Sequence, residues 1–443
     1  MLFDELPNEL LLSIAERLTS AKQISALMRT NHHFYALLYR LLYIYNIEEC
    51  RCSALNWSID RENMKPIETL LDLIFSTKKY SRWIPQIQGA LGEAAACGHD
   101  EIVEMFLKTE GFDVNGPMDE SPLYLACMFS NNARTVELLL ATGQIDPNIP
   151  KRAWALREWQ TPLFAAVDHQ NDKVVEALLA SEKVDPNVPN EDSRTPLFLA
   201  AQEGYAKSVE MLLATGRIVA MKSDPLQDTP LIAAAAEGRV AIVRRLLKED
   251  FVDVNERGRR GRTPLIAAVR EFQWEVVEEL LATSGVDTGL RDNSGRRALT
   301  HAVGRGCWQI VRDLVTMEGD EWNTGDPGFP TQFMRAVEFG HLDIIQFMLS
   351  MGRFDVNKLD VNGLSPLGAA VNYEHTHVVR SLLTVNRVWL NQPQSGQTPA
   401  RIARRRGLPE IADLIESCIP ACYRNRDDID IKVGGPYWLP PQE

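Results

Sequence analysis

The stretch that decides the fold is SRTPLFLAAQEG, Ser193 to Gly204, because much of its pattern returns along the chain at a nearly constant spacing. From Thr161 to Ser365, successive starts of the pattern are 34 residues apart. Starts of this kind occur at Ser53, Gly89, Ser121, Thr161, Thr195, Thr229, Thr263, Arg297, Thr331, Ser365 and Thr398. A period this regular indicates a chain built from stacked copies of one supersecondary unit.

Each unit has a physical interpretation as two helices and a turn. Thr195 is suited to cap a helix, and Pro196 occupies a first helical position where no N–H donor is missed. Small residues such as Ala200 allow neighbouring helices to approach, and Gly204 is suited to end the first helix in a left-handed conformation. An apolar second helix follows, and Asp-x-Asn sequences are typical of the connecting turns. These turns occur at Asp113/Asn115, Asp146/Asn148, Asp185/Asn187, Asp253/Asn255 and Asp355/Asn357.

The pattern resembles the ankyrin repeat, whose signature is T-P-L-H-x-A. The resemblance covers about 53 to 420 and implies an all-α solenoid of about ten or eleven helix-turn-helix repeats with β-hairpin-like fingers. We expect a degenerate repeat over residues 49–88, the main array over 89–420 and a C-terminal tail over 421–443. The signature His is absent, and apolar packing is expected in its place. The residues at that position are Tyr124, Phe164, Phe198, Ile232 and Ile266.

Residues 1–48 do not share the period and are predicted to form a small helical bundle. The run LPNELLLSIAERL, Leu6 to Leu18, has one apolar helical stripe and resembles an F-box. The resemblance implies docking on the Skp-type adaptor of an SCF ubiquitin ligase. The residues that would contribute to the contact are Leu6, Pro7, Leu10, Ile14 and Leu18. The alternative is that the bundle only caps the apolar end of the solenoid.

Composition narrows the class of protein further. Proteins that bind nucleic acid usually present a basic surface. The formal net charge of −13 therefore argues against nucleic acid as a partner. The seven cysteines lack the regular spacing of a disulfide framework, and no apolar run is long enough to span a membrane. We therefore expect an intracellular protein of the cytoplasm or nucleus, monomeric apart from its partners and without a membrane contact.

Motifs for catalysis are absent from the sequence. There is no P-loop, no dinucleotide-binding glycine motif and no nucleophile elbow. Glu374-His375-x-His377 has two metal-type ligands but no further ligand at a suitable spacing. We therefore predict no catalytic residues, no metal and no cofactor. An enzyme with its site in the concave groove is the remote alternative.

Arginines dominate the positions that would face a target between residues 256 and 305. On the ankyrin pattern these positions are the finger tips and the ends of the first helices. Guanidinium forks bind carboxylates with two hydrogen bonds, so the pattern favours a protein target with an acidic segment. The alternative is that the arginines pair with nearby acids such as Asp292 and Glu271. The candidate residues are Arg257, Arg259, Arg260, Arg262, Arg270, Arg296 and Arg305, with Arg291 and Arg297 in the same segment.

A second candidate contact is the insertion KRAWALREW, Lys151 to Trp159, which lengthens one finger. Trp154 and Trp159 are either anchors for the target or residues that pack on the adjacent finger.

Together, these features predict a non-catalytic protein-interaction module that is the substrate receptor of an SCF-type ubiquitin ligase. The alternative is an ankyrin scaffold or regulatory protein with no ubiquitin link.

Overall fold

The structure is a computed structural model, and it falls into two compact units, Met1–Val219 and Ala220–Glu443. The expected F-box-like block, Trp154 and the tail over 421–443 lie outside the described residues. The structure describes residues 53–76, 84–110, 112–115, 121–152, 159–219, 228–319, 322–323, 330–352, 355–360, 362–386, 388–391 and 397–419.

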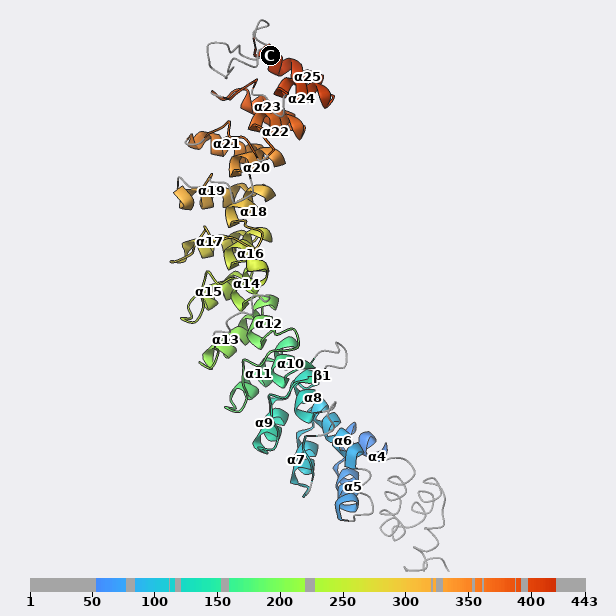
Figure 1. The fold of residues 1–443 in the computed structure, drawn as a ribbon. Helices are drawn as coiled ribbons and strands as arrows, with labels where there is room; N and C mark the ends of the chain where they lie inside the picture. Colours follow the sequence, from blue (N-terminus) through green and yellow to red (C-terminus); the bar gives the residue numbers. More distant parts are fainter. Residues whose placement is uncertain are drawn as a thin grey trace, which may run out of the picture. The chain divides into compact units, whose positions relative to one another are not determined.

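The described part of the first unit is a series of helix pairs with one short two-stranded sheet (Figure 1). Strands β1 and β2 are antiparallel, with Lys151 opposite Gln160, and they form the base of the inserted finger. The elements are α4 (Ser53–Ile59), α5 (Met64–Ser76), α6 (Ile84–Cys97), α7 (Asp100–Lys108), α8 (Pro122–Phe129), α9 (Ala133–Ala141), β1 (Lys151–Arg152), β2 (Trp159–Gln160), α10 (Pro162–Asp168), α11 (Asp172–Leu179), α12 (Pro196–Glu203) and α13 (Ala206–Ala214).

The second unit continues with the same helix pairs. Its elements are α14 (Pro230–Ala236), α15 (Val240–Leu246), the 3-10 turn η3 (Arg259–Gly261), α16 (Pro264–Arg270), α17 (Trp274–Ala282), α18 (Ala298–Arg305), α19 (Trp308–Glu318), α20 (Gln332–Phe339), α21 (Leu342–Met351), α22 (Pro366–Asn372), α23 (Thr376–Leu382), α24 (Pro399–Arg405) and α25 (Pro409–Ser417).

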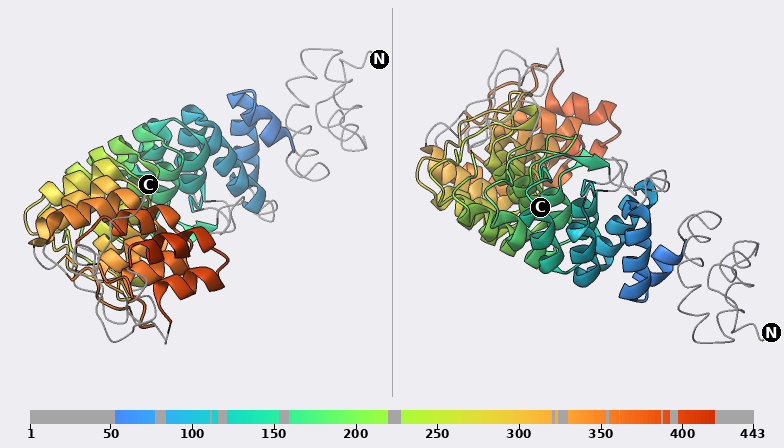
Figure 2. Two further views of the ribbon diagram at one scale, coloured as in Figure 1. Left: turned by 90° about the horizontal axis from the view of Figure 1, so that it is seen from above. Right: turned by 90° about the horizontal axis from the view of Figure 1, so that it is seen from below.

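Within each unit the helices form two layers. First helices pack on first helices, as in the succession α14, α16, α18, α20, α22 and α24, and second helices form the other layer (Figure 2). Small side chains such as Ala166, Ala200 and Ala268 are completely buried between them. The aromatic or aliphatic residues at the signature His position are buried at Tyr124, Phe164, Ile232 and Ile266, as expected.

The helix starts follow the expected chemistry in most repeats. The side chain of Thr263 accepts a hydrogen bond from the backbone N–H of Ile266 at 3.2 Å, with Pro264 at the first helical position. The same cap is made by Thr161, Thr195, Thr229, Thr331, Ser365 and Thr398. Other starts differ: Ser121 and Arg297 make no side-chain cap, and α6 begins at Ile84, not at Gly89.

The ends of the first helices and the connecting turns also match the sequence pattern. Gly204, Gly306 and Gly340 end their helices in the left-handed region. Three repeats without this glycine place Gln170, Phe272 or Glu374 there with positive φ, whereas the repeat that starts at Ser121 has Ser130 there in an extended conformation. In the five Asp-x-Asn turns, the Asp carboxylate accepts the backbone N–H of the Asn. Between repeats, the side-chain amides of Asn148, Asn187 and Asn255 donate to backbone carbonyls of the next repeat.

Candidate functional site

Two neighbouring repeats of the second unit depart from the pattern at their buried positions. At the fifth position of the repeat, where other copies have Ala233, Ala267 or Ala369, these two have His301 and Arg335. His301 is buried and Arg335 is half-buried. Further buried replacements in the same repeats are Arg297 for the capping Thr, Thr300 for an apolar residue and Gln332 for the helix-starting Pro. Violations of a local rule tend to concentrate at functional sites, so these repeats are where a site is expected.

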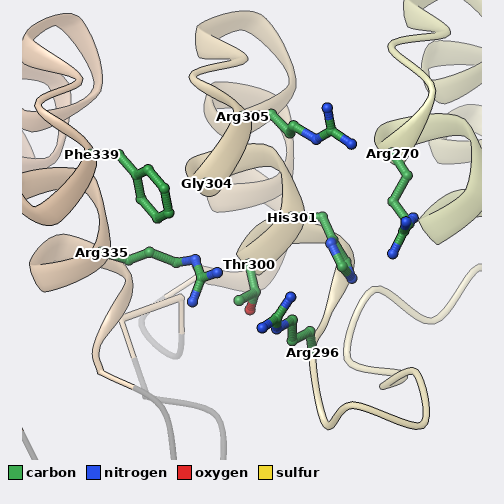
Figure 3. Close-up of a pocket in the computed structure, with 8 residues that line it drawn as sticks. All are labelled: Arg270, Arg296, Thr300, His301, Gly304, Arg305, Arg335 and Phe339. Atoms are coloured by element: carbon green, nitrogen blue, oxygen red, sulfur yellow. The ribbon is translucent and has the colours of Figure 1, made fainter.

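A pocket of about 230 Å³ opens where these replacements meet. Figure 3 shows Arg335 of α20 and Arg296 of the loop before α18 converging beside Thr300, with Arg270 of α16 on the other side of His301. None of the described residues that line it carries a carboxylate. We call it the arginine pocket, and it is lined by Arg270, Arg296, Thr300, His301, Gly304, Arg305, Arg335 and Phe339.

The space for Arg335 depends on a glycine. A Cβ atom added at Gly304 would lie 3.2 Å from the Nε atom of Arg335, closer than a comfortable contact. Aromatic rings flank the pocket on two sides. The guanidinium of Arg305 lies 5.0 Å from the centre of the Phe272 ring, and that of Arg335 lies 5.6 Å from the centre of the Phe339 ring. Such cation–π contacts help to hold the guanidinium groups in place.

His301 at the floor of the pocket is bound to Asp292, 2.8 Å from Nε2 to the carboxylate. Burial lowers the pKa of His301, and Arg270 and Arg296 lower it further, against the opposing effect of Asp292. Burial alone would raise the pKa of Asp292, but hydrogen bonds from the Arg296 backbone N–H and from His301 hold that pKa below its ordinary value. At a pH above this lowered pKa, His301 is a neutral imidazole, and its Nε2–H then donates to the Asp292 carboxylate.

Positive charge is concentrated next to the pocket as well. Burial lowers the pKa of Arg262, and the charges of Arg270 and Arg260 lower it further, while Asp228 and Glu271 act in the opposite direction. The Nε atoms of Arg262 and Arg270 are buried and have no hydrogen-bond partner among the described residues. Like charges gathered in this way disfavour one another, and an anion would relieve the repulsion.

Beneath the pocket, a buried ion pair replaces a helix cap. The side chain of Arg297 lies 2.8 Å from Glu318 at the end of α19, and both side chains are 5% exposed. Because Arg297 occupies the capping position, its helix has no side-chain cap. Among the Asp, Glu, Lys, Arg and His residues that the structure describes, the residues buried as a whole are Asp292, Arg297 and His301.

The structure separates the predicted target-binding residues into two groups. Arg270, Arg296 and Arg305 line the pocket together. Arg257 instead donates to the Arg291 carbonyl at 2.7 Å and braces neighbouring loops. The side chains of Arg259 and Arg260 are exposed at the η3 turn, and Arg262 is half-buried. Trp159 is 41% exposed on β2.

Arg335 and His301 were missed by sequence reasoning, which followed finger tips and helix ends up to residue 305. The signal that could have found them is a charged or titratable residue at the small fifth position of the repeat. The histidines of the Glu374-His375-x-His377 motif have another role. The Nε2 atom of His375 lies 2.8 Å from the Glu338 carbonyl, and that of His377 lies 2.9 Å from the Gly340 carbonyl. Both rings therefore link two repeats.

No group of three or more His, Cys, Asp or Glu side chains in the described part of the chain could hold a metal ion. None of the described helices combines the length and the apolar character that crossing a bilayer requires.

Comparison with models of protein families agrees with the repeat architecture. A model of the family "Ankyrin repeats (3 copies)" matches residues 123–223, 163–258, 218–292 and 333–424. Among solved structures, the chain is similar to the ankyrin repeat domain of Bcl-3, titled a unique member of the IkappaB protein family. That similarity has 26% sequence identity, covers 49% of this chain and 98% of that chain, and has a TM-score of 0.43. No curated protein matches. Since the family model matches more than half of the sequence, this chain belongs to the ankyrin-repeat family.

Proposed function

We propose that this chain is a non-catalytic receptor that binds an acidic segment of a protein target at the arginine pocket. Ankyrin repeats are protein-interaction modules, so the coarse function follows from the family. The observation that carries the finer proposal is the convergence of Arg270, Arg296 and Arg335 on one cavity, and no carboxylate is among the described residues that line it. The chain as a whole is acidic, with a net charge of −13, so this local positive charge is not a general property of its surface.

The pocket suits an anion held by side chains from different repeats. Guanidinium groups bind oxyanions with paired, charge-assisted hydrogen bonds, which are stronger than bonds between neutral groups. Phe272 and Phe339, 42% and 50% exposed, stand beside the pocket and offer apolar contacts to residues flanking the anion. Aromatic and arginine side chains are the residues most enriched in interface hot spots.

The proposal extends to residues 1–48, which would dock the receptor on the Skp-type adaptor of an SCF ubiquitin ligase. Its support is the sequence resemblance over Leu6, Pro7, Leu10, Ile14 and Leu18. The mechanism would be proximity, since the block would hold the ligase and the repeats would hold the target. Trp159 and the exposed Arg259 and Arg260 are proposed as secondary target contacts.

Binding of a fluorescent glutamate-rich peptide to the full chain tests the target half of the proposal. We expect binding that weakens with added salt and is lost in the variant Arg270→Glu/Arg305→Glu. Arg380→Glu is the matched control, because Arg380 is exposed on α23 in the layer of second helices. Equal affinity of the double variant and the control would contradict the proposal.

Co-purification with a Skp-type adaptor tests the ligase half. We expect the full chain to retain the adaptor and the variant Leu10→Glu/Ile14→Glu to lose it, with the peptide affinity unchanged. An adaptor that never binds, or that binds the variant equally well, would leave a target-binding scaffold and would remove the ubiquitin link.

A further inference from the structure

The position at which each first helix ends forms a row of side chains in the second unit. It is the last residue of α18 and α20 and the residue that follows α14, α16, α22 and α24. These helices pack on one another in chain order, and Figure 3 shows Arg305 and Phe339 on neighbouring helices. All six residues are exposed. We call this set the end row, and its members are Glu237, Glu271, Arg305, Phe339, Tyr373 and Arg406.

Hydrogen bonds between repeats hold members of the end row at a fixed spacing. The side-chain amide of Gln273 donates to the Ala236 carbonyl at 3.1 Å, and the Nε2 atom of His375 lies 2.8 Å from the Glu338 carbonyl. Each bond joins the turn after one row member to the residue before the preceding member. The ring of His375 also stacks on that of Tyr373, with 6.4 Å between the ring centres. The row is therefore a fixed feature of the packed helices.

The charges of the end row have no counter-ion among the residues that the structure describes. Glu237, Glu271 and Arg305 form no ion pair with another described residue. Arg406 donates to the neutral side-chain amide of Asn372 at 2.7 Å, which leaves its charge uncompensated in this part of the chain. By contrast, α15 and α17 in the other layer are joined by an arginine–glutamate ion pair. The charges at the helix ends are therefore available to a ligand.

We propose that the end row binds an extended segment of the target in which every third residue is complementary to one row member. The segment presents basic residues to the two glutamates, acidic residues to the two arginines and apolar residues to the two aromatic rings. Packed helices lie about 8–10 Å apart and an extended chain rises about 3.3 Å per residue, so each repeat spans about three residues of the segment. This inference rests on the proposed function, because it specifies the residues that flank the acidic one at the arginine pocket.

An extended segment of mixed charge fits this row better than a helix or a uniformly acidic chain. The arginine pocket beside Arg305 and Phe339 has a volume of about 230 Å³, which admits one side chain. An α-helix with its side chains is about 10 Å across and does not enter it. Phe339 and Tyr373, 50% and 45% exposed, offer apolar surface that the segment would cover. The net charge of −13 favours a segment that includes basic residues over one that is acidic throughout.

The test uses a fluorescent peptide that has lysine, lysine, glutamate, leucine, leucine and glutamate at successive third positions and serine elsewhere. Its reversed sequence is the second probe, because side-chain complementarity alone does not fix the chain direction. A scrambled peptide has the same composition without the spacing. By fluorescence anisotropy with the full chain, we expect the spaced peptide, in one direction, to bind about tenfold more tightly than the scrambled peptide or the glutamate-rich peptide.

Exchange of charge between the chain and the peptide tests the register. Glu237→Lys/Glu271→Lys should weaken binding of the spaced peptide about tenfold, because like charges then face each other. A spaced peptide with glutamates in place of its two lysines should restore the affinity of that variant, and a scrambled version of it should not. The matched control is Glu275→Lys/Glu278→Lys, exposed on α17 in the layer of second helices, which should leave binding unchanged. Circular dichroism checks that each variant is folded.

Other outcomes separate this inference from the proposed function. Equal binding of the spaced and scrambled peptides in both directions would overturn the inference. The proposed function would stand in that case if the glutamate-rich peptide binds and is lost in Arg270→Glu/Arg305→Glu. Binding of none of the peptides would overturn both. A chain that is also dimeric by size-exclusion chromatography would then identify a second copy as the occupant of the row.

Discussion

The repeats that start at Thr263 and Arg297 are neighbours with the same pair of helices, but their interiors differ in kind. In the Thr263 repeat, the Thr263 hydroxyl group caps α16 and a proline occupies the first helical position. Ile266, Ala267 and Ala268 are buried in its interior. In the Arg297 repeat, charged and polar side chains take the corresponding places, with Arg297, Thr300 and His301 buried. The comparison teaches that the ankyrin backbone accepts buried polar groups when each is given a partner, as Arg297 and His301 are by Glu318 and Asp292.

The largest expected effect is loss of the buried ion pair in the Arg297 repeat. Arg297→Thr restores the capping residue of the Thr263 repeat but leaves Glu318 buried without its guanidinium group. We expect the free energy of unfolding to fall by about 3–5 kcal/mol, measured by urea denaturation. The double variant Arg297→Thr/Glu318→Leu should recover most of that loss. A change of under about 1 kcal/mol in the single variant would show that the pair does not hold this repeat together.

The Thr263 repeat should respond to loss of its cap. Thr263→Ala removes the acceptor for the Ile266 backbone N–H, and we expect a loss of about 1 kcal/mol in the free energy of unfolding. Thr263→Ser is the control, because it keeps the hydroxyl group and should cost less. Equal losses in the two variants would assign the effect to side-chain packing and not to the cap.

A smaller effect is expected from Gly304→Ala, which should raise stability but lower affinity for the peptide. Alanine in a helix interior is more stable than glycine by about 0.5–1 kcal/mol, so Gly304→Ala should raise the thermal midpoint slightly. The added Cβ atom displaces the flexible end of Arg335, so affinity for the glutamate-rich peptide should fall. A stabilised variant with unchanged affinity would show that the position of Arg335 is not important for binding.

The smallest expected effect is a pH dependence of stability that belongs to the Arg297 repeat. The pKa of His301 is lowered in the folded protein, so below about pH 6.5 the unfolded chain binds a proton that the folded chain does not. Stability should therefore fall as the pH decreases from 7 to 5. His301→Gln should flatten this dependence in urea denaturation at each pH. An identical slope in the variant would assign the dependence to other groups.

The sequence predicted the repeat architecture because its signals are local. A threonine before a proline, a glycine after a helix and an Asp-x-Asn turn each act within a few residues. The structure confirms these roles at Thr263, Gly306 and Asp253. The candidate target site was predicted only in part, since Arg270, Arg296 and Arg305 line the pocket while Arg257 braces two loops.

By itself, the sequence determined the period, the helix pairs and the segment in which arginines accumulate, because each depends on neighbours in the chain. Only the tertiary structure decided that Arg270 and Arg335, on helices either side of α18, meet at one cavity over His301. It also decided that the Arg297 side chain is buried against Glu318 and is not presented to a protein target. The physical reason is that a side chain's role in a stacked array depends on which layer it faces and on the residue the next repeat places opposite it.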